Sequence, residues 1–365
     1  MTRLHDLHSQ QGQSPWLDNL RRDWIVDGEI QRWVDQGVRG ITSNPSIFQK
    51  SISTGTAYDE QFAELVNGGS SIDEAYWELV IRDIVDALGI LRATYDSSAG
   101  EDGYVSVEVA PALAMDQAGT EAAARVLSER IGLPNLYVKI PATKPGVPAI
   151  RQMIAEGRPI NVTLIFSLDR HAEVIEAYIS GLEELAKDPQ ADLSTVSSVA
   201  SFFISRVDTE IDKRLNAIGT EEALSLRGTG AVAQGQLAYQ LFLEKFSGPR
   251  WEALAPRGAR VQRPLWASTS TKNPAYPDTL YIDALVGPDT VNTIPDATLV
   301  AFEDHGTVAR TIDADPAGAM STWERIGALV DLDDVGQVLE DEGVASFQKA
   351  FDELLETLEK KATGL

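Results

Sequence analysis

A single lysine interrupts the apolar, β-rich run Tyr137–Thr143, and its amine is the first candidate in this chain for a nucleophile. Lys139 lies between Val138 and Ile140, and Pro141 ends the run. Such a run is typical of a buried parallel strand, where an unpaired ammonium is costly. An amine with a pKa lowered by an apolar or cationic setting can attack a carbonyl and form a Schiff base. The alternative is a salt-bridged or end-of-strand lysine that extends to water.

Polar residues also fall in or just after other short apolar runs. The set is Asp18, Asn44, Glu108, Lys139, Asn161, Thr163, Ser201 and Ser268. Each has an ordinary explanation when taken alone, such as a helix cap for Asp18, a turn for Asn44 or a β-branched strand residue for Thr163. Together they form the pattern expected where the carboxyl ends of parallel strands converge on a catalytic site.

Eight such runs alternate with helical segments along the chain. The runs are Ser14–Asn19, Gly37–Ile41, Tyr104–Val109, Tyr137–Ile140, Pro159–Phe166, Ser197–Ile204, Arg263–Ser268 and the weaker Thr290–Ile294. This alternation predicts an α/β fold, and the count favours a closed parallel (β/α)8 TIM barrel over an open sheet.

The 365 residues exceed a minimal barrel by roughly a hundred residues. The excess predicts helical insertions after the second and sixth runs, and the spacing over Phe347–Lys361 predicts an amphipathic C-terminal helix. No linker rich in Pro, Gly or Ser divides the chain, so we expect one domain, 1–365.

The composition excludes several classes of partner. A formal net charge of −24 disfavours nucleic acid and anionic membranes, which require patches of Lys and Arg. The chain contains no cysteine, and therefore no disulfide, thiolate metal site or cysteine nucleophile. The polar N-terminus, Met1–Gln13, does not resemble a signal peptide, and no run reaches the length of a membrane span. A cytoplasmic location is predicted.

Five longer motifs are distinctive in combination. They are Thr42-Ser43-Asn44-Pro45-Ser46, Glu108-Val109-Ala110-Pro111, Val138-Lys139-Ile140-Pro141-Ala142-Thr143, Asn161-Val162-Thr163-Leu164-Ile165-Phe166-Ser167 and Trp266-Ala267-Ser268-Thr269-Ser270-Thr271-Lys272-Asn273-Pro274. With these motifs the chain resembles the transaldolases, a family of class I aldolase-type barrels, from Ser14 to about its end. It looks like the longer bacterial and plant-like branch. Shorter members have Ser-Pro-Phe-Val-Gly-Arg where this chain has Ser201-Phe202-Phe203-Ile204-Ser205-Arg206, so the arginine is kept but Pro and Gly are not.

The resemblance implies four catalytic residues. Lys139 would attack the ketone of a ketose phosphate and hold it as a protonated Schiff base. Asp18 would take the proton of the C4 hydroxyl, so that the C3–C4 bond breaks and an aldehyde phosphate leaves. A three-carbon enamine would stay on Lys139 until it adds to a second aldehyde phosphate. Glu108 and Thr163 would position a water that moves protons while the carbinolamine forms and collapses.

The resemblance also implies a substrate-binding set, which comprises Asn44, Asn161, Ser201, Arg206, Ser268 and Lys272. Asn44 and Asn161 would hold the hydroxyls of the three-carbon unit. Arg206 is the main phosphate candidate because its planar fork pairs with phosphate oxygens, and Ser268 and Lys272 would assist it. Lys272 has the alternative of a solvated loop lysine.

The implied reaction belongs to the non-oxidative pentose phosphate pathway. A dihydroxyacetone unit would pass from fructose 6-phosphate or sedoheptulose 7-phosphate to erythrose 4-phosphate or glyceraldehyde 3-phosphate. No cofactor is expected. No metal is expected either, because the four histidines have no ligand-like spacing. The sugar phosphates are the expected partners, and the chain would act as a monomer or a homodimer.

Two other functions remain open at this point. A fructose-6-phosphate aldolase would share the lysine but release dihydroxyacetone without an acceptor. A non-catalytic barrel that binds sugar phosphates would share the fold alone. One further motif, Gly228-Thr229-Gly230-Ala231-Val232-Ala233, matches a dinucleotide fingerprint, but no β-rich strand precedes it. A turn between two helices explains it better.

Overall fold

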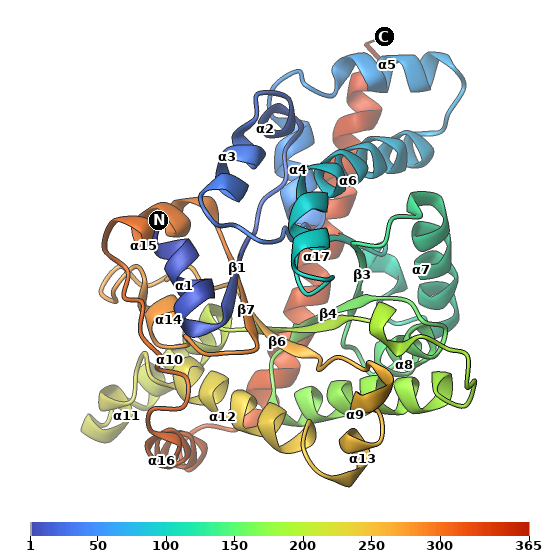
Figure 1. Cartoon of the computed structure of the whole chain (residues 1–365). Helices are drawn as coiled ribbons and strands as arrows, with labels where there is room; N and C mark the ends of the chain where they lie inside the picture. The colour runs from blue at the N-terminus through green and yellow to red at the C-terminus, as the bar shows by residue number, and fades with distance from the viewer. Residues whose placement is uncertain (1, 365) are drawn as a thin grey trace.

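Seven parallel strands form one sheet at the centre of the computed structural model, which describes residues 2–364. In chain order they are β1 (Gln13–Leu17), β2 (Val105–Glu108), β3 (Leu136–Pro141), β4 (Ile160–Ile165), β5 (Ser198–Phe203), β6 (Arg263–Ala267) and β7 (Thr290–Ile294). The order across the sheet is β1-β7-β6-β5-β4-β3-β2, and every pairing is parallel. The sheet therefore curls with β1 and β2 at its two ends, which confirms an α/β, barrel-like architecture (Figure 1).

The second predicted run does not form a strand of its own. Ile41 instead makes two isolated parallel bridges, one to Leu17 of β1 and one to Val105 of β2. Gly40 passes directly against the indole of Trp16, at a point where a Cβ atom would overlap the ring. The run is thus too short and too close to the central tryptophan for a regular ladder, and the other seven runs coincide with strands.

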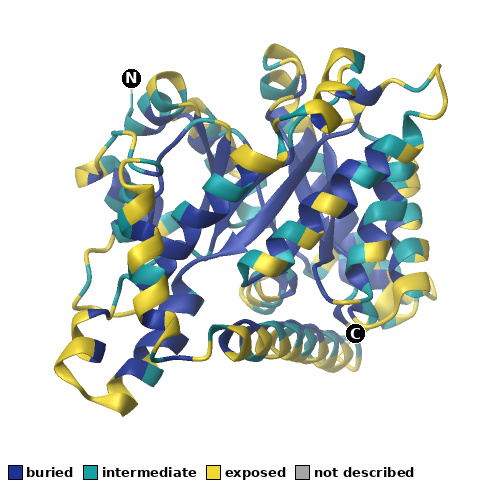
Figure 2. Cartoon of the chain, turned by 90° about the horizontal axis from the view of Figure 1, so that it is seen from below, coloured by how far each residue is buried: buried dark blue, intermediate teal, exposed yellow. Residues whose placement is uncertain are grey.

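Helices surround the sheet and turn their exposed faces outward, as Figure 2 shows. They are α1 (Arg3–Gln11), α2 (Arg22–Val26), α3 (Glu29–Asp35), α4 (Pro45–Ser53), α5 (Asp59–Asn67), α6 (Ile72–Ser97), α7 (Gln117–Ile131), α8 (Gly146–Ala155), α9 (Leu168–Leu185), α10 (Ser205–Ile218), α11 (Glu221–Ser225), α12 (Gly230–Lys245), α13 (Pro249–Glu252), α14 (Leu280–Asp283), α15 (Asp296–His305), α16 (Pro316–Gly327) and α17 (Leu332–Ala362). Short 3₁₀ turns lie at η1 (Pro111–Leu113), η2 (Leu193–Thr195) and η3 (Ala255–Arg257).

Two of the expected helical insertions are present. The helices α4, α5 and α6 follow the Ile41 segment, and α10 to α13 follow β5. Gly68 and Gly69 lie between α5 and α6, and Ser71 and Glu74 form a capping box that starts α6. Within residues 2–364, every helix is either too short or too polar to cross a membrane.

The C-terminal helix α17 is longer than predicted and crosses the carboxyl end of the strands. It contacts α4, α6, η1 and α10, and it meets β4 near the carboxyl end of that strand, where Gly343 lies against Leu164. In Figure 1 it is the long red helix that leads to the C-terminus. Phe347, Phe351, Leu354 and Leu358 on this helix are buried. The helix therefore covers the mouth of the barrel with an apolar face.

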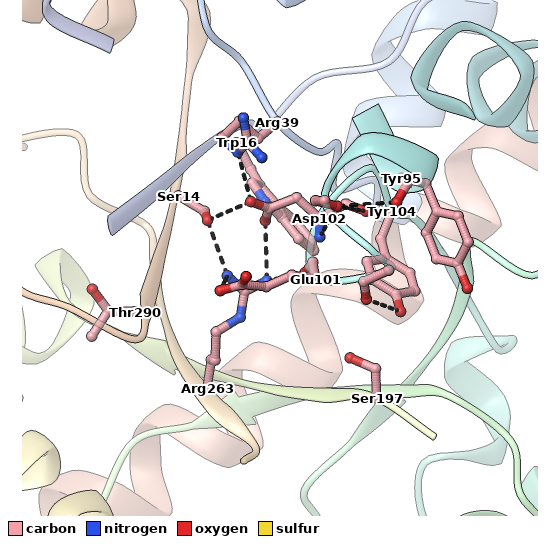
Figure 3. Close-up of polar contacts among 12 residues, drawn as sticks. Ser14, Trp16, Arg39, Tyr95, Glu101, Asp102, Tyr104, Ser197, Arg263 and Thr290 are labelled. Carbon is pink, nitrogen blue, oxygen red and sulfur yellow. Dashed lines mark hydrogen bonds and ion pairs between the residues drawn. The ribbon is translucent and has the colours of Figure 1, made fainter. Parts of the chain in front are cut away.

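A buried polar network lies at the opposite, amino-terminal end of the strands (Figure 3). Asp102 is fully buried and accepts hydrogen bonds from Ser14 Oγ at 2.8 Å and Arg39 Nε at 2.6 Å. Its other carboxylate oxygen lies 3.1 Å from Nη2 of Arg263 and accepts from Trp16 Nε1 at 3.3 Å. These contacts join β1, β6 and the segments before Ile41 and β2.

Candidate active site

A cavity of about 190 Å³ opens at the carboxyl ends of the strands, beneath α17. Its lining comprises Asp18, Thr42, Asn44, Ser46, Lys139, Thr163, Ser201, Phe203, Arg206, Ala267, Ser268, Ser270, Lys272, Thr293, Pro295 and Phe347. Eight of the ten predicted site residues are in this lining. The other two, Glu108 and Asn161, lie behind it, each in contact with a lining residue.

Lys139 enters the cavity from the middle of β3 and is 4% exposed. Its Nζ atom lies 3.2 Å from Oε2 of Glu108 and donates to the carbonyl oxygen of Ser43 at 3.3 Å. The ring centroid of Phe347 is 5.8 Å from the same nitrogen. The amine thus has an ion-pair partner, as in the salt-bridged alternative considered from the sequence, and its setting is not purely apolar or cationic.

Glu108 ends β2 and is the register partner of Lys139. Burial raises the pKa of its carboxyl, and the charge of Lys139 opposes that rise. A carboxyl with a raised pKa beside an amine is suited to exchange a proton with it.

Asp18 directly follows β1, with its side chain partly exposed to the cavity. Its Oδ1 atom accepts a hydrogen bond from Thr42 Oγ1 at 2.7 Å. Burial raises the pKa of Asp18, while the charge of Lys139 and the Thr42 hydrogen bond act in the opposite direction. Asp18 therefore has the character of a base with a higher pKa than an ordinary aspartate.

Thr163 and Asn161 both come from β4 but have different surroundings. Thr163 Oγ1 is buried against the cavity and has no hydrogen-bond partner among residues 2–364. Asn161 is fully buried, donates to Ser106 Oγ at 2.9 Å and accepts from Ser201 Oγ at 2.7 Å. The Thr163 hydroxyl is thus available to a bound molecule, whereas Asn161 orients Ser201.

Asn44 has a structural role as well as a place in the cavity lining. It is the N-cap of α4, and its Oδ1 atom accepts a hydrogen bond from the Ile47 amide at 3.0 Å. The capping bond uses the side-chain oxygen and leaves the amide nitrogen as a donor toward the cavity. A turn-forming role and a binding role are therefore compatible at this residue.

Arg206 lies in the first turn of α10, and its guanidinium packs between two aromatic rings. The Cζ atom is 5.3 Å from the ring centroid of Phe203 and 6.0 Å from that of Phe347. No carboxylate of residues 2–364 lies within ion-pair distance of it, and desolvation lowers its pKa. An unpaired guanidinium at the edge of a cavity is well suited to an anionic group.

The loop after β6 brings Ser268, Ser270 and Lys272 to the same cavity. Ser268 adopts a left-handed backbone, with φ of 57°, and its hydroxyl lies 2.9 Å from that of Ser205 at the start of α10. Lys272 Nζ donates to Ser270 Oγ at 2.6 Å. Partial desolvation and the nearby Arg206 charge lower the pKa of Lys272. The two cations therefore face one part of the cavity.

Several lining residues were not predicted. Thr42 and Phe203 fall inside motifs already recognised, so their neighbours in sequence could have indicated them. Phe347 belongs to a helix far along the chain, and nothing in the sequence indicates that it faces Lys139.

Comparisons with known proteins agree on one family. The family model described as transaldolase/fructose-6-phosphate aldolase matches residues 15–358. "Transaldolase 1" of Streptomyces coelicolor is 50% identical over 357 residues, which cover 96% of this chain and 93% of that protein. "Transaldolase" of Mycolicibacterium smegmatis is 49% identical over 351 residues, covering 95% and 94%. "Transaldolase" of Mycobacterium leprae (strain Br4923) is 48% identical over 357 residues, covering 97% and 95%. The matched region contains every residue of the cavity.

Proposed function

The chain belongs to the transaldolase/fructose-6-phosphate aldolase family and is a transferase with transaldolase activity, and we propose that Lys139 is the amine that carries the transferred unit. The observation that supports this role most directly is the position of its Nζ in the cavity, 3.2 Å from the Glu108 carboxylate. This activity places the chain in the non-oxidative pentose phosphate pathway.

In the proposed first step, Lys139 forms a Schiff base. The neutral amine attacks C2 of fructose 6-phosphate or sedoheptulose 7-phosphate after giving a proton to Glu108. The carbinolamine then loses its hydroxyl as water, and the carboxyl returns the proton to that leaving group. We assign Thr163 to hold the water involved, because its buried hydroxyl has no partner among the described residues.

The next step breaks a carbon–carbon bond. Asp18 removes the proton of the C4 hydroxyl, the C3–C4 electron pair moves into the protonated Schiff base, and an aldose phosphate leaves. The three-carbon enamine that remains on Lys139 attacks the aldehyde of a second aldose phosphate, erythrose 4-phosphate or glyceraldehyde 3-phosphate. Asp18 returns its proton to the new alkoxide, and water then releases the ketose from Lys139. The raised pKa of Asp18 supports this shuttle.

The remaining polar residues bind substrate in this proposal. The Asn44 amide nitrogen and the Ser201 hydroxyl hold the hydroxyls of the three-carbon unit, and Asn161 acts through its hydrogen bond with Ser201. Arg206 and Lys272, assisted by Ser268, bind the phosphate. A cationic pair confined to one cavity can attract anions even when the whole chain carries a net charge of −24.

The wider organisation is proposed on similar grounds. The Ile41 segment, although not a strand itself, takes the place of an eighth strand in this proposal, because its single-residue bridges to Leu17 and Val105 reach both ends of the sheet. We regard residues 1–365 as one TIM-barrel domain. We also propose that the chain works in the cytoplasm as a monomer or homodimer without nucleic-acid partners; cell fractionation and sedimentation would test location and assembly.

Borohydride trapping tests the mechanism. Enzyme incubated with fructose 6-phosphate is reduced with and without erythrose 4-phosphate, and the labelled peptide is mapped by mass spectrometry. We expect a three-carbon adduct on Lys139 that the acceptor depletes as sedoheptulose 7-phosphate appears. The Lys139→Met variant should give no adduct, whereas Asp18→Ala should trap the whole ketose without cleavage.

Two results would contradict parts of this proposal. An adduct that clears as dihydroxyacetone at the same rate without acceptor would favour the aldolase named in the family description. Full turnover by Lys139→Met would exclude the Schiff-base mechanism.

A further inference from the structure

The loop that carries Lys272 is fastened to the body of the protein through Tyr276. Inside the loop, the Tyr276 amide donates to the Asn273 carbonyl oxygen at 3.0 Å, and Thr271 Oγ1 donates to the Pro277 carbonyl oxygen at 2.8 Å. These bonds close residues 271–277 into one compact turn. Whatever holds Tyr276 in place therefore also sets the position of Lys272.

The side chain of Tyr276 is held by a hydrogen bond to Asp212 and by packing against Gly228. Its hydroxyl donates to Asp212 Oδ2 at 2.6 Å, and Oδ1 of the same carboxylate accepts from the Gly228 amide at 2.9 Å. A Cβ atom on Gly228 would lie 2.7 Å from Cζ of the tyrosine ring. The glycine thus leaves the space that the ring occupies.

This arrangement explains the Gly228-Thr229-Gly230 motif. Gly228 lies between α11 and α12 and has a positive φ of 71°. The amide of Ala231, in the first turn of α12, donates to Asp208 Oδ1 at 2.7 Å, and Tyr281 Oη donates to Asp208 Oδ2 at 2.9 Å. The motif therefore serves as the surface on which the segment after β6 packs, and not as a dinucleotide site.

The carboxylate that holds Tyr276 belongs to the same helix as Arg206. Asp208 and Asp212 are both buried on α10, whose first turn contains Arg206. The beginning of the loop is also tied to this helix, because the Ser205 amide donates to the Ser268 carbonyl oxygen at 3.0 Å. Helix α10 thus holds the guanidinium directly and the Lys272 loop through two separate attachments.

We propose that Tyr276, seated on Asp212 and Gly228, is a positioning residue that fixes Lys272 relative to Arg206 and so sets the affinity for the substrate phosphate. This inference rests on the proposed phosphate role of Arg206 and Lys272. We call the contacts of Tyr276 with Asp212 and Gly228 the latch. Without the latch the loop remains attached only at its ends, and Lys272 spends less time at the phosphate. Chemistry at Lys139 does not depend on the latch.

The test compares ligands with and without a phosphate in wild type, Tyr276→Phe and Gly228→Ala. For fructose 6-phosphate and for dihydroxyacetone, the half-saturating concentration for borohydride trapping on Lys139 is measured. Calorimetry with inorganic phosphate gives an affinity that does not depend on the Schiff base. Gly219→Ala is the matched control, because Gly219 also has a φ of 70° but a Cβ atom there would meet only the Asn216 carbonyl oxygen, at an ordinary contact distance of 3.7 Å.

We expect Tyr276→Phe and Gly228→Ala to lower the affinity for fructose 6-phosphate and for inorganic phosphate about tenfold. This is the size of effect expected from loss of a hydrogen bond to a charged group. In both variants the half-saturating concentration of dihydroxyacetone should stay within about twofold of wild type. In Gly219→Ala the affinity for every ligand should stay within the same limit. Thermal unfolding checks that each variant is folded.

These measurements distinguish a failure of the latch from a failure of the proposed phosphate site or Schiff base. If Lys272→Ala lowers the affinity for phosphate and the latch variants do not, the proposed role of Tyr276 is wrong and the proposed phosphate site is supported. Equal losses for dihydroxyacetone and fructose 6-phosphate would likewise overturn the inference, since they would indicate a general structural defect. If Lys272→Ala leaves phosphate affinity unchanged, both the latch and the proposed role of Lys272 fall. Absence of any trapped adduct in wild type would refute the Schiff base alone, because the calorimetric comparison still decides the latch.

Discussion

Glu108 and Lys139 face each other as register partners on adjacent parallel strands, with Oε2 of the one 3.2 Å from Nζ of the other. The ladder between β2 and β3 holds both side chains, so no flexible loop has to bring them together. Because the two residues are only 8% and 4% exposed, bulk water cannot readily replace either partner. The strand pairing thus fixes in advance the geometry of the proton exchange that we propose between them.

Replacing Glu108 by Gln should remove this exchange while keeping the shape of the side chain. We expect kcat to fall by about 10²- to 10⁴-fold, the usual contribution of a general acid–base group. Trapping kinetics on Lys139 should show that Schiff-base formation is the step that slows. The control Glu64→Gln, at an exposed position of α5, should leave the rate unchanged. Wild-type trapping kinetics in Glu108→Gln would remove the carboxyl from the mechanism.

Thr42→Val should move the acid limb of the pH–rate profile to higher pH. The Thr42 hydrogen bond favours the charged form of Asp18 and so lowers its pKa, and its removal must raise that pKa. At a given pH fewer molecules then hold Asp18 as the base, and kcat/KM falls on the acid side while the alkaline plateau remains. Thr120→Val removes a buried hydroxyl outside the cavity and should not shift the profile. An unmoved limb in Thr42→Val would assign it to another group.

Phe347→Ala should open the cavity above Lys139. Its ring lies over both Lys139 and Arg206, and its loss admits water to the enamine. We expect about a tenfold lower rate of transfer, with part of the three-carbon unit released as dihydroxyacetone. Phe351→Ala is the matched control, because it removes a buried ring from the same helix that packs on Tyr76 instead. The same release of dihydroxyacetone from both variants would trace the effect to α17 as a whole.

Asp102→Asn should destabilise the protein without altering the reaction. The change leaves Arg39 and Arg263 without their buried counter-charge, which typically costs about 3–5 kcal/mol of unfolding free energy. Urea unfolding measures the loss, and kcat should match that of wild type under native conditions. Asp96→Asn, in an exposed helical pair with Arg92, should cost less than about 1 kcal/mol. A comparable loss in Asp96→Asn would show that the buried network has no special weight.

The same network predicts the acid sensitivity of the fold. Burial raises the pKa of Asp102, but Arg263 and Arg39 outweigh that effect and bring it below the usual value. A carboxyl with a lowered folded-state pKa stabilises the fold above its unfolded value of about 4, and this contribution is lost as the pH falls below that value. The difference in unfolding free energy between wild type and Asp102→Asn should therefore shrink as the pH is lowered from about 4 through the folded-state pKa of Asp102. A constant difference over that range would contradict this assignment.

Much of the fold was predictable because strand positions follow local pattern. Seven apolar runs became strands, and polar residues within or just after them, including Lys139 and Asp18, line one cavity because parallel strands end on the same side. The Gly37–Ile41 run was predicted as a strand by the same pattern. Its reduction to a bridge depends on the Trp16 ring against Gly40, a tertiary contact that local pattern does not contain.

Parts of the candidate site were beyond the sequence for the same reason. The apolar spacing around Phe347 predicts a helix but not which turn of it faces Lys139. The Gly228 motif indicated a turn, yet its partner Tyr276 became evident only from the packing of two distant segments. The partner of Lys139 also depends on strand order, which places β2 beside β3.

The crossing of the barrel mouth by α17 has a consequence for protein synthesis. A ribosome completes Lys139 and all seven strands before it reaches Phe347. At about 5–20 residues per second, the segment from Ile294 to Phe347 takes several seconds to translate. Until then the chain lacks the Phe347 ring that lies 5.8 Å from the Lys139 amine. Synthesis of α17 therefore supplies the last wall of the cavity that Lys139 lines.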